Sequence, residues 1–161
     1  RERVALLKDL PISVFDTVFK SIHLSQNAQE FISILQKKGI LVGLVSGGFS
    51  PIVERLAKSL DIFYFSANQL EVKDGFLTGR LVGEIVTGQV KESTLEKWRT
   101  ELGLPKERTI AIGDGANDLL MLKSAGHGIA FCAKEVVKAE IACHVDTRDL
   151  LEVLPLIEFL E

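Results

Sequence analysis

The spacing of apolar residues changes repeatedly along the chain, and each change marks the border of a predicted element. An apolar stripe with helical spacing ends at Pro11, and a second helical pattern follows over residues 12–23. Ser25 is the expected N-cap of the next helix, and Gly39 marks its expected end. Residues 40–45 then form a short apolar run rich in β-branched side chains, which favours a strand.

Short apolar runs and helical patterns alternate over the rest of the chain. The pattern predicts helices over residues 51–60, 91–102, 118–124 and 134–140 and from about 149 onward, and strands over residues 63–65, 69–73, 76–81, 109–112, 127–131 and 142–145. Asp74 and Gly75 suit a type I′ turn, so residues 69–81 are expected to form a β-hairpin. Apolar strands that alternate with helices predict an α/β fold, in which helices cover both faces of a parallel sheet.

Two loops follow predicted strands, and ligands of parallel sheets bind where the strands end. The first loop is Ser46-Gly47-Gly48. Its glycines allow a close approach of the backbone to a ligand, and the N–H groups at the start of the next helix favour an anion. A plain turn between strand and helix is the alternative. The G-x-S-x-G elbow of serine hydrolases is excluded, because Gly43 stands at the wrong distance before the serine.

The second loop, residues 113–118, carries two carboxylates at one turn. If Asp114 and Asp118 lie about 4 Å apart, they repel each other by about 4 kcal/mol at an effective dielectric near 20, so a positive charge is expected beside them. Hard oxygen ligands after a strand suit Mg²⁺, which takes one or two carboxylates and shares the rest with a phosphate. The alternative is that Asn117 or Asp118 caps the following helix. Because Asp118 stands where a dinucleotide-binding fingerprint needs glycine, that fingerprint is excluded.

The charge and composition of the 161 residues exclude several classes of protein. A net charge of -3 argues against a nucleic-acid-binding protein. No apolar stretch approaches the roughly 20 residues of a membrane span, and no targeting signal is recognisable. The two cysteines, Cys132 and Cys143, are too few for a disulfide framework and are expected to be buried thiols. We therefore expect a cytoplasmic protein that binds neither nucleic acid nor membranes, and the sequence does not indicate an oligomeric state.

Several motifs together resemble one family. They are VSGGF at residues 45–49, KDGFLTG at residues 73–79, Lys91, and AIGDGANDLLMLKSAG at residues 111–126. The chain is similar over essentially its whole length to the phosphoserine phosphatases of the haloacid dehalogenase-like superfamily. The resemblance implies a Rossmann-like core over residues 26–161, which includes the hairpin, and a small helical cap to which residues 1–25 belong. It also implies Mg²⁺-dependent hydrolysis of L-phosphoserine to L-serine, the last step of serine biosynthesis.

The same resemblance implies roles for residues at the phosphate. Ser46 and Gly47 would hold the phosphate, and Lys91 would neutralise its charge, so that Ser46 and Lys91 take part in catalysis. Asn117 would bind the substrate through a hydrogen bond near the phosphate or near the rest of the substrate. From the sequence alone, Lys91 is an ordinary lysine, and most lysines lie on the solvated surface.

Further implied roles concern the metal and the rest of the substrate. Asp114 would ligate Mg²⁺, and Asp118 would support the metal site from nearby. Arg3, on the cap, would bind the carboxylate of the phosphorylated amino acid in a charge-assisted pair.

One family motif has no counterpart in the sequence. The D-x-D-x-[TV] run, which supplies the nucleophilic aspartate, is absent from the 161 residues. In the family its strand lies between those that would end here at Val45 and Ile112, so we expect the nucleophile to lie upstream of residue 1. The 161 residues alone should then be inactive. Two alternatives remain open: a catalytically inactive, phosphatase-like binding protein, and a phosphatase for another small phosphomonoester.

Overall fold

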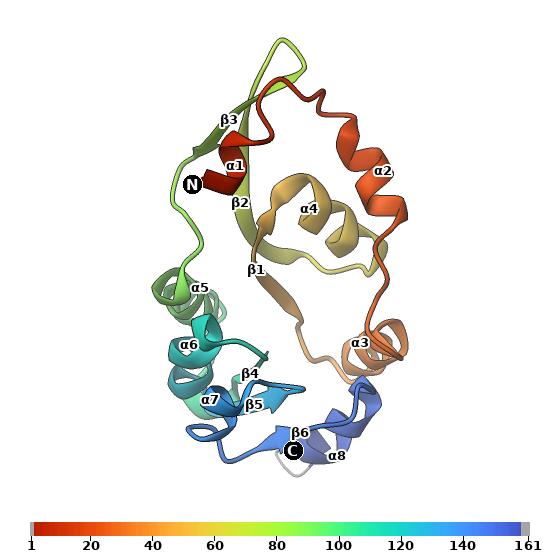
Figure 1. Ribbon diagram of the computed structural model, residues 1–161. Helices are drawn as coiled ribbons and strands as arrows, with labels where there is room; N and C mark the ends of the chain where they lie inside the picture. The colour runs from red at the N-terminus through yellow and green to blue at the C-terminus, as the bar shows by residue number, and fades with distance from the viewer. Residues whose placement is uncertain (1, 159–161) are drawn as a thin grey trace. The chain divides into compact units, whose positions relative to one another are not determined.

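A computed structural model describes residues 2–158 of the chain (Figure 1). The chain forms two compact units. The first consists of the described residues up to His23 and of Gly39–Val86, and the second consists of Leu24–Lys38 and the described residues from Thr87 onward.

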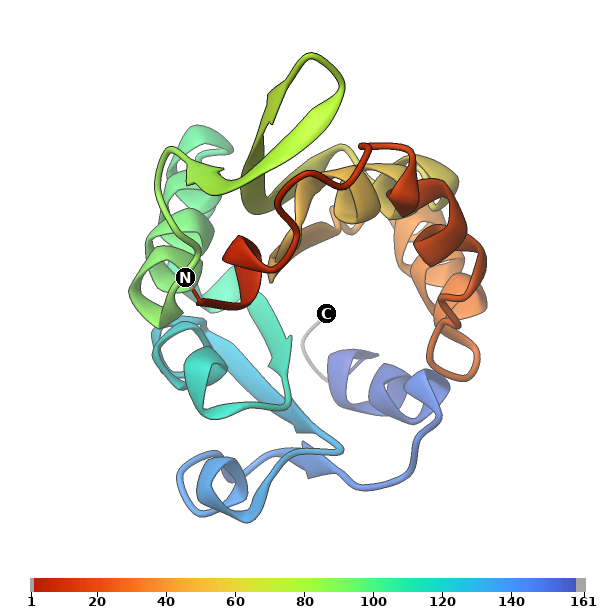
Figure 2. The ribbon, with the colours of Figure 1, turned by 45° about the horizontal axis from the view of Figure 1, so that its top comes forward.

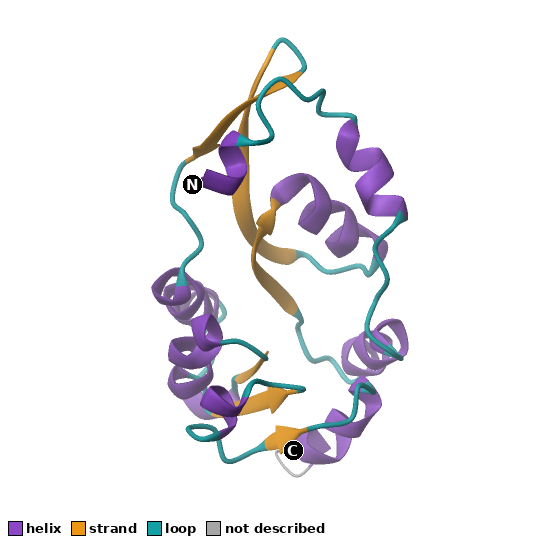
Figure 3. Ribbon diagram, in the orientation of Figure 1, coloured by secondary structure: helices purple, strands orange, loops and turns teal. Residues whose placement is uncertain are grey.

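The elements of the first unit are α1 (Glu2–Ala5), α2 (Val14–Lys20), β1 (Gly43–Phe49), α4 (Ser50–Ser59), β2 (Tyr64–Lys73) and β3 (Phe76–Val82). Its sheet has the order β1-β2-β3, with β1 parallel to β2 and β2 antiparallel to β3 (Figure 3). Pro51 lies in the first turn of α4, where its missing N–H costs no helical hydrogen bond. This helix buries Val53 and Ala57 and packs on β1 and β2.

The hairpin of β2 and β3 confirms the prediction from the Asp-Gly pair. Asp74 and Gly75 have φ angles of 52° and 84°, and positive φ at both central residues is the requirement of a type I′ turn. The segment after α1 pairs with the free edge of the hairpin. Asp9 donates its N–H to the carbonyl of Leu77, and Leu77 donates to Leu10, each at 2.8 Å. These two hydrogen bonds hold the segment after α1 against β3.

The elements of the second unit are α3 (Ala28–Lys37), α5 (Gly88–Glu101), η1 (Lys106–Arg108), β4 (Ile110–Gly113), η2 (Ala116–Asp118), α6 (Leu119–Ser124), β5 (His127–Phe131), α7 (Glu135–Lys138), β6 (His144–Val145), η3 (Leu150–Val153) and α8 (Leu154–Glu158). Its sheet is parallel throughout, with the order β4-β5-β6. Helix α6 packs on β4 and β5, and α5 lies beside α6 (Figure 2).

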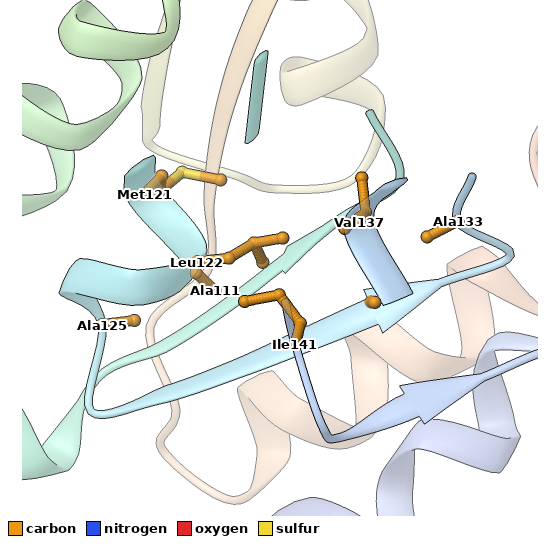
Figure 4. Close-up of a cluster of buried hydrophobic side chains, with 8 residues drawn as sticks. Ala111, Met121, Leu122, Ala125, Ala133, Val137 and Ile141 are labelled. Atoms are coloured by element: carbon orange, nitrogen blue, oxygen red, sulfur yellow. The ribbon is translucent and has the colours of Figure 1, made fainter. Parts of the chain in front are cut away.

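A cluster of buried apolar side chains from α6, from α7 and its flanking residues, and from strands β4 and β5 packs together (Figure 4). Its buried members are Ala111, Met121, Leu122, Ala125, Ala130, Ala133, Val137 and Ile141. The approach of α6 to β5 is close, because a Cβ atom on Gly128 would lie 2.3 Å from the carbonyl oxygen of Leu122. The cluster therefore fixes the position of α6, and with it the turn that precedes α6.

The α/β class is confirmed, whereas several details of the predicted elements were wrong. The described strands form two sheets of three strands, and β1 and β4 each pair on one side only. The separate strands expected over residues 63–65 and 69–73 are one strand, β2. The N-cap of α3 is Asn27 and not Ser25. The two cysteines are free but only half-buried.

The division into a cap over residues 1–25 and a core over residues 26–161 stays a prediction. None of the helices in the described part of the chain is both long and apolar enough to cross a membrane.

Candidate active site

The side chain of Asp118, the last residue of the loop after β4, forms hydrogen bonds with the backbone of the same loop. Asp118 is 5% exposed, and its Oδ2 accepts hydrogen bonds from the N–H groups of Asp114 and Gly115, each at 3.1 Å. The side chain crowds the backbone, because a Cβ atom on Gly113 would lie 2.6 Å from the Cβ of Asp118. The alternative that the Asp118 side chain caps the following helix is therefore wrong, because this side chain accepts no capping hydrogen bond from α6 and bonds instead to the backbone that precedes η2. Gly113 is the residue that leaves room for it.

The positive charge expected at this loop comes from Lys91. Its Nζ lies 2.6 Å from Oδ1 of Asp118, and the lysine is only 7% exposed. The interpretation of Lys91 as an ordinary surface lysine is therefore wrong. Two buried opposite charges in direct contact offset each other. Removal of one partner lowers the stability of the fold strongly, because the other charge is left buried without compensation.

The start of α5 places Lys91 beside the loop. Thr87 is the N-cap, and its Oγ1 accepts a hydrogen bond from the N–H of Val90 at 3.3 Å. A Cβ atom on Gly88 would lie 3.0 Å from the carbonyl oxygen of Asn117, so the first turn of the helix lies against the loop. Lys91 is one turn further along, and from there it reaches Asp118.

Asp114 and Asn117 lie on the exposed side of the same loop. The carboxylate of Asp114 has no hydrogen-bond or ion-pair partner among residues 2–158, whereas both oxygens of Asp118 are engaged. The carbonyl of Asp114 accepts from the N–H of Lys134 at 3.1 Å, which holds its backbone in place. Asp114 is thus a fixed residue with an open carboxylate.

The donor set of this loop fits a divalent cation that takes few ligands from the protein. The described residues contain no group of three or more His, Cys, Asp or Glu side chains that would hold a metal by themselves. A hard cation such as Mg²⁺ needs only one or two carboxylates when a phosphate completes its coordination. Asp114 is the open carboxylate of the loop, and Asp118 acts on it through its backbone N–H.

The second candidate segment, Ser46-Gly47-Gly48, lies in the first unit and inside β1, so the prediction that the strand ends at residue 45 and that a loop follows was wrong. The pairing of β1 with β2 shifts between Ser46 and Phe49, so Gly47 and Gly48 bulge out of the ladder. The Oγ of Ser46 accepts a hydrogen bond from the N–H of Gly48 at 3.0 Å. Since the hydroxyl oxygen is used as an acceptor, its proton is available for an acceptor outside the segment.

The sequence analysis did not identify Asn68, whose side chain forms a hydrogen bond with the backbone of this segment. It lies on β2 and is 6% exposed. Its Nδ2 donates to the carbonyl of Gly47, and its Oδ1 accepts from the N–H of Val86, each at 2.8 Å. Its position offered no local signal, because Asn68 falls between the strands predicted over residues 63–65 and 69–73.

Arg3 lies exposed on α1, which the N-terminal segment fastens to the hairpin. The loop after β4 in the second unit brings together four of the predicted site residues, namely Lys91, Asp114, Asn117 and Asp118. Ser46, Gly47 and Arg3 belong to the first unit. That the two groups share a substrate stays a prediction, as does every individual role assigned to them.

Comparison with known proteins places the chain among phosphatases. The sequence model described as "haloacid dehalogenase-like hydrolase" matches residues 1–123. The phosphoserine phosphatase of Streptococcus thermophilus is 51% identical over 157 residues, which are 98% of this chain and 73% of that protein. A solved substrate-bound phosphoserine phosphatase complex has a TM-score of 0.91 and 43% identity, over 96% of this chain and 74% of the other. A solved phospho-aspartyl intermediate analogue of phosphoserine phosphatase has a TM-score of 0.90, with the same identity and coverage.

Proposed function

The chain belongs to the haloacid dehalogenase-like hydrolase family, and we propose that it is a phosphoserine phosphatase, which hydrolyses L-phosphoserine to L-serine and phosphate. The observation that carries the proposal is the loop after β4, where the buried Lys91–Asp118 pair lies beside the open carboxylate of Asp114. The similarity to phosphoserine phosphatases over almost the whole chain supports the choice of substrate.

The loop after β4 has a net negative charge that suits a cation. Lys91 and Asp118 offset each other, so the carboxylate of Asp114 is left as the uncompensated charge of the loop. Asp114 would hold Mg²⁺, which would neutralise part of the charge of a bound phosphate. Asp118 would keep Asp114 in position through the hydrogen bond from its backbone N–H.

The chain's own donors would hold the phosphate. Ser46 would donate its hydroxyl proton to a phosphate oxygen, since its Oγ already accepts from Gly48. Lys91 would supply an ammonium group that is held rigidly by Asp118, and Gly47 and Asn117 would contribute polar contacts from the two segments. Arg3 would bind the carboxylate of the substrate and so select a phosphorylated amino acid.

The 161 residues contain no D-x-D-x-[TV] run. We place the nucleophilic aspartate of a phosphoaspartyl route outside these residues, by analogy with the relative solved as a phospho-aspartyl intermediate analogue. The 161 residues alone would then bind a phosphate without turnover, because the group that attacks phosphorus is missing.

The test is the release of inorganic phosphate by the full-length protein from phosphoserine, phosphothreonine and p-nitrophenyl phosphate, in the presence of Mg²⁺. We expect the highest kcat/KM with phosphoserine. A higher kcat/KM with another monoester would point to a phosphatase with a different substrate. Binding of phosphoserine without any hydrolysis would point to a phosphatase-like binding protein, and the proposed activity would be wrong.

A further inference from the structure

The side-chain amide of Asn68 joins two backbone segments that are far apart in sequence. Its Nδ2 donates to the carbonyl of Gly47 and its Oδ1 accepts from the N–H of Val86, both at 2.8 Å. The side chain is buried, with an exposure of 6%. The side-chain amide serves both partners, since its nitrogen donates and its oxygen accepts.

The first of these partners belongs to the segment that carries Ser46. Gly47 follows Ser46 directly and lies in the bulge where the register of β1 against β2 shifts. A residue that leaves the ladder loses hydrogen-bond partners on the neighbouring strand. Asn68 lies on that neighbouring strand and supplies a donor from its side chain, so it fixes the conformation of the bulge.

The second partner leads directly into the helix that carries Lys91. Val86 is the last residue of the first unit, it is buried, and Thr87 after it is the N-cap of α5. The N–H of Lys91 donates to the carbonyl of Thr87 at 2.9 Å, so the first turn of α5 begins at this point. Asn68 thereby holds the residue from which the chain enters the lysine-bearing helix.

We propose that Asn68 is a positioning residue, which fixes the conformation of the Ser46-Gly47-Gly48 segment and of Val86, the residue that leads into α5. The inference rests on the proposed function, because it takes the phosphate roles of Ser46 and Lys91 from there. Asn68 itself does not touch the substrate, and its effect is transmitted through the backbone at Gly47 and Val86.

Two variants separate the two contacts. Asn68→Asp keeps an oxygen that accepts from Val86 and replaces the donor to Gly47 by a second oxygen, whereas Asn68→Ala removes both contacts. Ile62→Ala is the matched control, because Ile62 is buried to a similar extent in the same unit and precedes β2, away from the bulge. All three variants are expected to lower the melting temperature.

The kinetic readout distinguishes positioning from a general loss of stability. In the full-length protein, at a temperature where every variant is folded, both Asn68 variants should lower kcat/KM for phosphoserine by about ten- to a hundredfold, the range expected from a misplaced binding group. The fall should be similar with p-nitrophenyl phosphate, since the two substrates share the phosphate. Ile62→Ala should stay within about twofold of the wild type, a change worth about 0.4 kcal/mol.

A second measurement does not need turnover. It compares the affinity for inorganic phosphate, measured by competition, and the amide chemical shifts of Gly47 and Gly48. Both should change in the two Asn68 variants and remain unchanged in Ile62→Ala. If the wild type hydrolyses phosphoserine while the Asn68 variants keep its kcat/KM and its phosphate affinity, Asn68 is merely structural and the inference is wrong. If the wild type does not hydrolyse phosphoserine, the proposed function fails, and unchanged Gly47 and Gly48 shifts would overturn the positioning role as well.

Discussion

The contact between Lys91 and Asp118 predicts a large and specific loss of stability when one partner is removed. In Lys91→Met the Oδ1 of Asp118 loses an ammonium group at 2.6 Å, while the carboxylate stays buried at 5% exposure. Breaking a buried ion pair on one side costs about 3–5 kcal/mol, because an uncompensated charge remains in the interior. A change of 1 kcal/mol shifts the melting temperature of a chain of this size by about 2–4 °C, so we expect a fall of about 6–20 °C.

Thermal and urea unfolding of the full-length protein would measure this loss, with Lys97→Met as the matched control. Lys97 lies on the same helix, its side chain is 69% exposed, and its only ion pair among the described residues is with Glu101 at 4.0 Å. The control should change the free energy of unfolding by no more than about 0.5 kcal/mol. A similar loss in the two variants would show that the burial of Lys91 does not matter.

A double-mutant cycle tests the pairing itself. Asp118→Asn removes the charge but keeps an oxygen for the N–H groups of Asp114 and Gly115. The double variant, Lys91→Met with Asp118→Asn, leaves no uncompensated charge, so its loss should be smaller than the sum of the single losses by about 2–3 kcal/mol. Losses that add to within about 0.5 kcal/mol would refute the inference that the two side chains are paired in the folded protein.

Three further predictions concern the metal, the substrate and the pH. A chelator should abolish phosphate release and Mg²⁺ should restore it; full activity in excess chelator would contradict the metal role. Asp114→Asn should also abolish phosphate release. It should change the free energy of unfolding by less than about 0.5 kcal/mol, because the carboxylate is exposed. Arg3→Ala should raise KM for phosphoserine more than KM for p-nitrophenyl phosphate, which has no carboxylate, and equal effects would remove the role of Arg3. The hydrogen bond from Lys138 at 2.7 Å lowers the pKa of Asp146. The resulting stabilisation is present above the ordinary carboxyl pKa of about 4 and is lost as the pH falls through the lower folded-state value. Urea midpoints at neutral pH and at about pH 3 should therefore differ more in the wild type than in Lys138→Met; equal differences would show that this pair does not contribute.

The features that the sequence predicted correctly depend on neighbouring residues. Asp74 and Gly75 determine the hairpin through their own φ angles. The loop after β4 brings Asp114 and Asp118 together because they are four residues apart and Gly113 leaves room for the second side chain. Such signals can be read from a short window of sequence.

The features that were missed depend on contacts between distant residues. The bond from Lys91 to Asp118 spans 27 positions, and the bonds of Asn68 span 21 and 18. The N-cap of α3 was misplaced for the same reason, since both oxygens of Asp149, 122 positions away, accept from the side chain of Asn27 at 2.9 Å. No local pattern predicts that a particular lysine or asparagine is buried with a partner.

The central proposal, which the structure leaves to experiment, is that Ser46, Lys91 and Asp114 serve one phosphate together with a divalent cation. A crystal structure of the full-length protein with Mg²⁺ and phosphate would test it most directly. We expect the phosphate to accept hydrogen bonds from Ser46 Oγ and Lys91 Nζ and to share the cation with a carboxylate oxygen of Asp114. A phosphate that is bound away from these three side chains, or a cation bound without Asp114, would contradict the claim.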